Sequence, residues 1–119
     1  MKGKVIIMPF INTNTNTEIS KEQEITLKEK LGKAIEILGK SEGWLMLSFE
    51  DNCSMYFKGE SKPMAFVDIS VFGSSSDSQC ERMTKEVCSI FKEVLGISPD
   101  CVYVKYSGSS QWGWNNMNF

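Results

Sequence analysis

The sequence predicts an α+β fold in which two β-α-β units form one four-stranded mixed sheet with both helices on one face. Two stretches that begin at Leu38 and Leu95 resemble each other, with Leu, Gly and Ser in register before a strand-like run. Before each stretch lies a segment with helical periodicity, and before that segment lies an apolar strand candidate. Strands joined through a helix pair in parallel with a right-handed connection, so two such units join into a mixed sheet.

The first unit begins with a strand candidate at roughly Val5 to Asn14. A helix is expected from Ser20 to Leu38, because Gln23 completes a capping box at its start and Gly39 suits the position after its last turn. The second strand of the unit is expected around Trp44 to Leu47. Apolar residues at helical spacing predict the buried side of the helix: Leu27, Leu31, Ala34, Ile35 and Leu38.

The second unit repeats this plan. Its first strand is expected at Ala65 to Phe72, and its helix from Ser78 to Leu95, with Glu81 completing the capping box and Gly96 ending the helix. Its last strand includes Val102 to Val104. The predicted inner side of the helix consists of Met83, Val87, Ile90, Phe91 and Val94.

This two-layer arrangement leaves one face of the sheet without a helix. Strands such as Trp44 to Leu47 and Val102 to Val104 carry large residues at successive positions, so both of their faces favour burial. We therefore expect an oligomer that encloses the open sheet faces. Short extra strands around Met55 to Phe57 and Gln111 to Trp114 are expected to pair with the sheet edge of a neighbouring subunit.

The composition restricts the possible functions. A chain of 119 residues is expected to form a single domain, 1–119, and a net charge of −2 gives no basic surface for nucleic acid. Arg82 is the one arginine, which leaves no arginine pair to clamp phosphates or dicarboxylates. No apolar run approaches the roughly 20 residues of a membrane helix, and Val5 to Met8 is too short for a signal peptide. We expect a cytoplasmic protein with no membrane partner.

The sequence contains no histidine, which excludes Ser–His and Cys–His nucleophile systems and the usual zinc sites. No metal or organic cofactor is expected. An enzyme of this composition needs another base: a thiolate, a lysine or carboxylate with a shifted pKa, or an α-amine. None of the four cysteines forms a C-x-x-C pair, and free thiols are expected at Cys53, Cys80, Cys88 and Cys101.

Several segments together make this sequence resemble the macrophage migration inhibitory factor family, which has the tautomerase fold. The resemblance covers Pro9 to Phe119 and implies a homotrimer with an active pocket at each subunit boundary. It also implies that an initiator methionine is removed to expose a proline. The segments are MPFINTN at 8–14, Gly39 with Lys40, ISPD at 97–100 with VY at 102–103, and GWNN at 113–116 with the ending at Phe119.

The resemblance implies keto–enol tautomerisation of an aromatic 2-keto acid of the phenylpyruvate type. Pro9 would be the catalytic base, Lys40 would bind the substrate carboxylate, and the backbone at Phe72 would line the pocket. The neighbouring subunit would contribute Tyr103 and Lys105. The aromatic wall would consist of Trp112 and Phe119, with Trp44 at the rim.

An N-terminal proline is a secondary amine, and its pKa falls when it is buried near a lysine. Such a base, with a pKa near the working pH, moves a proton beside a carbonyl and supplies what a histidine-free chain lacks. Inside a longer chain the Pro9 nitrogen is a non-basic amide. Residues 1–8 are therefore expected to be an N-terminal extension or a misassigned start before the initiator Met8, and activity is expected only from the form that begins at Pro9.

Some of these residues also have plainer interpretations. Lys40 is favoured by the dipole of the helix that it follows, and Lys105, where well-known family members have asparagine, can be a surface lysine. Trp114 is expected to be a core or interface plug. Where vertebrate members of the family carry a C-x-x-C, this chain has Met64 to Val67, so no thiol–disulfide activity is inferred. The alternative function is a non-catalytic, cytokine-like interaction protein with a vestigial or blocked pocket.

Overall fold

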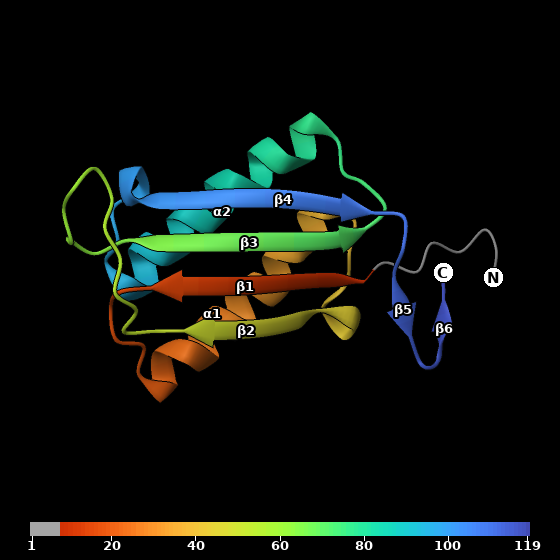
Figure 1. Ribbon diagram of the computed structural model, residues 1–119, viewed down its shortest axis with the longest axis horizontal. Coiled ribbons are helices and arrows are strands. Elements are labelled where there is room, and N and C mark those ends of the chain that lie inside the picture. The colour runs from red at the N-terminus through yellow and green to blue at the C-terminus, as the bar shows by residue number, and fades with distance from the viewer. Residues whose placement is uncertain (1–7) are drawn as a thin grey trace.

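The computed structural model describes residues 8–119 and contains a four-stranded sheet in the order β2-β1-β3-β4 (Figure 1). Helices α1 (Lys21–Ala34) and α2 (Asp77–Leu95) lie on the same face of this sheet. The predicted α+β fold class is confirmed. The strands are β1 (Pro9–Thr15), β2 (Met46–Glu50), β3 (Ala65–Phe72) and β4 (Val102–Ser109).

Two β-α-β units build the sheet, as the internal repeat predicts. Strands β1 and β2 are parallel and joined through α1, whereas β3 and β4 are parallel and joined through α2. The units meet where β1 and β3 pair in antiparallel. Each helical segment ends at a left-handed glycine, Gly39 (φ 76°) or Gly96 (φ 70°), a conformation that side chains with a Cβ rarely adopt.

The hydrophobic core lies between the helices and the sheet. Ile11 of β1, Val67 of β3 and Phe91 of α2 are completely buried there. All five apolar residues expected on the inner side of the first helix are buried, and so are those of the second except Val94, which packs against the core and stays partly exposed. The helical periodicity therefore identified the buried sides of both helices.

The first helix begins as expected, but its last turn is a 3₁₀ turn and not α-helical. The Ser20 hydroxyl accepts a hydrogen bond from the Gln23 backbone N–H (3.1 Å), and the Gln23 side chain accepts one from the Ser20 backbone N–H (2.9 Å). The α-helix ends at Ala34, and a 3₁₀ turn, η1 (Ile35–Leu38), replaces the last predicted turn. Tightening of a final helical turn in this way is common.

The second helix begins one residue earlier than the sequence predicts, and its predicted cap is wrong. Ser76 caps α2, and Gln79 completes the capping box, in place of Ser78 with Glu81. Both pairs match the pattern of serine followed three residues later by a long polar side chain. Starting at Asp77 also places a carboxylate in the first turn, where the helix dipole favours it.

Replacing Ser76 by alanine is expected to lower the free energy of unfolding by about 1 kcal/mol, because the Gln79 backbone N–H loses its acceptor. Thermal or urea unfolding measures this loss. Ser78→Ala is the matched control, two residues further on and exposed, and is expected to change stability by about 0.5 kcal/mol or less. A larger loss for Ser78→Ala than for Ser76→Ala would contradict the observed cap.

Several strand boundaries differ from the predictions. Trp44 ends a 3₁₀ turn, η2 (Glu42–Trp44), so β2 starts later than expected and runs to Glu50. Within the single chain the segment Met55 to Phe57 forms only an isolated bridge, between Phe57 and Glu60, and its expected pairing with a neighbouring subunit stays a prediction. The predicted first residues of β1, 5–7, lie outside the described part of the chain. Two short strands form a hairpin near the C-terminus: β5 (Gly113–Trp114) and β6 (Met117–Asn118).

The face of the sheet without helices is polar at its centre. Ser48, Asn12, Asp68 and Lys105 occupy one level across all four strands. Large side chains on this face remain exposed in the single chain, as expected for a face that an oligomer covers, and Tyr103 is 60% exposed. The polar centre was not anticipated from the sequence. Within residues 8–119, no helix combines the length and apolar character that crossing a bilayer requires.

Candidate active site

The candidate site lies at the end of the sheet where β1 begins and β3 ends. Pro9 is the first residue of β1, is buried, and is paired in register with Val71. The backbone N–H of Phe72 donates to the carbonyl of Met8 (3.2 Å), which fixes the end of β3 beside the start of β1. The end of α1 and the C-terminal hairpin approach the same end of the sheet (Figure 1).

Lys40 follows the left-handed Gly39 at the end of the first helical segment. Its side chain is only 8% exposed, and this burial lowers the pKa of Lys40 below its ordinary value of 10.5. None of the ion pairs formed within residues 8–119 includes Lys40. A cation that has lost most of its water and has no carboxylate beside it favours an anionic ligand, which is the chemistry expected of a carboxylate-binding lysine.

Aromatic rings form a continuous run beside this site. Trp44 meets Trp114 edge to face, with ring centroids 4.9 Å apart. Trp114 stacks on Phe119 at 6.3 Å, and Phe119 lies 6.0 Å from Phe72. The Trp112 carbonyl accepts a hydrogen bond from the Phe119 backbone N–H (2.9 Å), so Trp112 also helps to hold this run. The structure therefore connects Trp44 and Phe119 of the predicted wall through Trp114, and it joins Trp112 to them through its backbone.

Trp114 is 45% exposed, so it is not a core plug within the single chain, and it is the ring that connects Trp44 to Phe119. Its other expected role, as an interface plug, stays a prediction. The hairpin that carries it turns at Asn115 (φ 55°) and Asn116 (φ 67°), both left-handed. Asparagine tolerates this conformation, and two such residues between strands are a hairpin signal. Only the first strand of this hairpin was predicted, around Gln111 to Trp114, and the two asparagines are the signal that would have added the second.

Tyr103 and Lys105 do not join the other candidates within one chain. Tyr103 is in register with Phe66, six residues before Phe72, which corresponds to roughly 20 Å along the strand. Its ring meets Phe57 edge to face at 5.1 Å. Lys105 lies opposite Asp68 on the open face of the sheet. These two side chains can complete a site around Pro9 only if they come from another copy of the chain.

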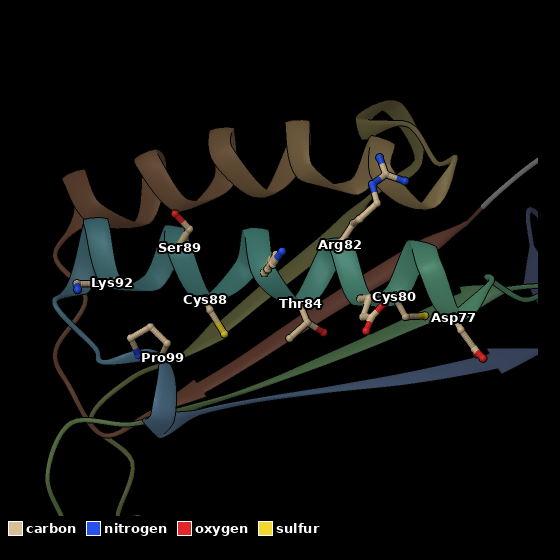
Figure 2. Close-up of a pocket in the computed structure, with 10 residues that line it drawn as sticks. Asp77, Cys80, Arg82, Thr84, Cys88, Ser89, Lys92 and Pro99 are labelled. Atoms are coloured by element: carbon tan, nitrogen blue, oxygen red, sulfur yellow. The ribbon is translucent and has the colours of Figure 1, made fainter.

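The largest cavity described lies elsewhere, along the outer side of α2 near Pro99, with a volume of about 1090 Å³ (Figure 2). Its side chains are spread along the helix and do not converge on one point. Burial raises the pKa of Cys80 and Cys88, which line this groove. These groups are therefore protonated at neutral pH. Because its side chains do not converge on one point, this groove is not the candidate active site.

Comparisons with known proteins find similar sequences and similar structures along most of the chain. The family model described as macrophage migration inhibitory factor matches residues 8–119. The macrophage migration inhibitory factor of Meriones unguiculatus is 28% identical over 114 residues, which cover 94% of this chain and 99% of that protein. The crystal structure of Leishmania major MIF2 superposes with a TM-score of 0.89 at 28% identity, covering 94% of this chain and 97% of that one. The crystal structure of the homologue from Prochlorococcus marinus superposes with a TM-score of 0.84 at 28% identity, covering 92% of this chain and 98% of that one.

Proposed function

This chain belongs to the macrophage migration inhibitory factor family, and on that basis we propose that it is a keto–enol tautomerase of aromatic 2-keto acids such as phenylpyruvate. The observation that carries the proposal is the position of Lys40. This buried cation, without a carboxylate partner within residues 8–119, follows the helix that ends beside the start of β1. The same end of the sheet carries Pro9 and the aromatic run from Trp44 to Phe72.

Each candidate then has a defined part in the reaction. The secondary amine of Pro9 takes a proton from the carbon between the ring and the ketone, and the electron pair of that bond forms the enolate. The protonated amine returns the proton to the enolate oxygen, which gives the enol, and the reverse path gives the ketone. Lys40 holds the carboxylate of the substrate, while Trp112 and Phe119 contact its ring. This chemistry requires no metal and no organic cofactor.

A homotrimer completes the proposed pocket. Tyr103 and Lys105 lie on the open face of the sheet, away from Pro9 of their own chain, and from there they would reach the pocket of a neighbouring subunit. Lys105 would add a second cation beside the substrate carboxylate. The four cysteines are all free thiols, which agrees with the proposed cytoplasmic location.

The first eight residues determine whether this chemistry is available. In the sequence as it stands, the Pro9 nitrogen belongs to an amide and cannot accept a proton. We therefore treat residues 1–8 as an extension before the functional start, with Met8 as the initiator that is removed. Family resemblance begins at this point, since the matching region starts at residue 8.

The proposal is tested by comparing two forms of the protein in one assay. The form that begins at Pro9 is expected to interconvert the keto and enol forms of phenylpyruvate, measured by ultraviolet absorbance of the enol. The full 119-residue chain is expected to be at least about 100-fold slower, because general-base catalysis contributes about this much and its amine is blocked. Equal rates for the two forms would contradict a Pro9 base.

Two further measurements separate the proposal from its alternative. Light scattering should give the mass of three subunits, and the mass of one subunit would leave the pocket without Tyr103 and Lys105. The blocked amine of the full chain favours the alternative, a cytokine-like interaction protein whose pocket no longer catalyses. If the chain made in its own host keeps residues 1–8 and still binds a protein partner, the alternative is the better description.

A further inference from the structure

The centre of the open sheet face contains a carboxylate oxygen without a partner. Oδ1 of Asp68 is closed off from solvent and accepts no hydrogen bond within residues 8–119. Burying a charged oxygen without a donor is unfavourable, so a donor in reach of Asp68 will be drawn to it. The neighbouring side chains in the same row across the sheet limit which donors can reach this oxygen.

On one side of Asp68 in this row stands Asn12, which is already engaged. The Asn12 amide nitrogen donates to Asn14 Oδ1 (3.0 Å), and its oxygen accepts from the hydroxyl of Ser48 (2.6 Å). On the other side, in register on β4, stands Lys105, which forms no ion pair with Asp68 within residues 8–119 of the single chain. Neighbouring strands are about 4.8 Å apart, which a lysine side chain spans easily. Among the described strand residues that face this way, Lys105 carries the only positive charge.

We propose that Asp68 is a positioning residue that holds Lys105 against the open face of the sheet and so limits the affinity of the neighbouring pocket for the substrate carboxylate. This inference rests on the proposed function, in which Lys105 serves the pocket of another subunit. The Lys105 ammonium then has two competing anions, the Asp68 carboxylate of its own chain and the carboxylate of the ligand. Ligand binding has to displace the first, so Asp68 weakens binding.

The test measures binding without chemistry. The probe is 3-phenylpropanoate, which has the ring and carboxylate of the substrate but no ketone, titrated by calorimetry into the full chain and into the form that begins at Pro9. Asp68→Asn is expected to tighten binding about two- to five-fold, the range that corresponds to a partly exposed ion pair. In the tautomerase assay the same variant should lower KM with kcat unchanged. A residue with a purely structural role would not produce this split.

Matched variants show whether Asp68 acts through Lys105. In a Lys105→Met background, Asp68→Asn is expected to have no effect on affinity, because there is no ammonium to release. Asp68→Glu keeps the charge and should bind the probe like the parent protein. The neutral probe 3-phenylpropanamide should bind equally to parent and Asp68→Asn. If Asp68→Asn does not fold, Asp68→Ser makes the same test.

The inference is overturned if Asp68→Asn or Asp68→Ser binds 3-phenylpropanoate as tightly as the parent protein or more weakly. It is also overturned if Asp68→Asn increases the affinity equally in the Lys105→Met background. Failure of the parent protein to bind the carboxylate probe while it tautomerises phenylpyruvate also overturns it. If instead the probe binds but the Pro9 form has no tautomerase activity, the proposed function fails. The linkage between Asp68 and Lys105 is then still decided by the calorimetry.

Discussion

Replacement of Pro9 by glycine, in the form that begins at this residue, is expected to lower kcat for phenylpyruvate at least about 100-fold. The proline ring fixes the position of the amine at the buried start of β1, where Pro9 is in register with Val71. Glycine retains an amine, but one with a free φ rotation that no longer holds the nitrogen in line with the substrate. Loss of orientation alone is costly when the base must meet one particular carbon–hydrogen bond.

A second proline provides the control for this experiment. Pro63→Gly makes the same substitution at an exposed position just before β3 begins, at the opposite end of the strand from Phe72. It is expected to leave kcat and KM within about two-fold of the parent values, since surface changes away from the site have small effects. Full activity of Pro9→Gly would refute the proposed base, whatever the control shows.

Replacement of Lys40 by methionine is expected to raise KM for phenylpyruvate about 10- to 100-fold, with a smaller effect on kcat. A hydrogen bond to a charged group contributes about 1.5–3 kcal/mol, and the methionine keeps the apolar stem that fills this buried position. Substrate and transition state both carry the carboxylate, so its loss weakens binding of both. Steady-state kinetics of the purified variant measure the two parameters separately.

Lys33→Met is the matched control for Lys40→Met, because Lys33 is exposed and lies in the last turn of α1. It should leave KM unchanged. Burial lowers the pKa of Lys40, and the charged form is the one that binds carboxylate. KM of the parent protein should therefore rise with increasing pH at values below 10.5, and this rise should be absent in Lys40→Met. A rise of the same size in both proteins would assign the effect to another group.

Much of the fold follows from local patterns in the sequence. The repeat of Leu, Gly and Ser after Leu38 and Leu95 marks two copies of one unit, and the two left-handed glycines confirm that the copies end alike. Helical periodicity predicted the buried sides of both helices because packing against one sheet requires a single apolar stripe. The capping box failed at α2, where two overlapping patterns of equal quality stand two residues apart.

The site was less predictable, because its features depend on contacts between distant segments. The aromatic run places Trp114 between Trp44 and Phe119, and no local pattern relates positions so far apart. The register of β3 with β4 sets Asp68 opposite Lys105, and pairing of strands is a property of the assembled sheet. Burial of Lys40 likewise depends on the elements around it.

Gly39 and Gly96 occupy equivalent corners of the duplicated fold, at the ends of the two helical segments. The residues that follow them differ in chemical character. After Gly39 the chain continues with a lysine, and after Gly96 it continues with Ile97, which is completely buried. Because β1 and β3 are antiparallel, these equivalent corners lie at opposite ends of the sheet. One backbone path therefore serves twice, once to place the cation that we propose binds the substrate and once to close the core. Under the proposed function, the residue after each glycine distinguishes the end of the duplicated fold that binds substrate from the end that does not.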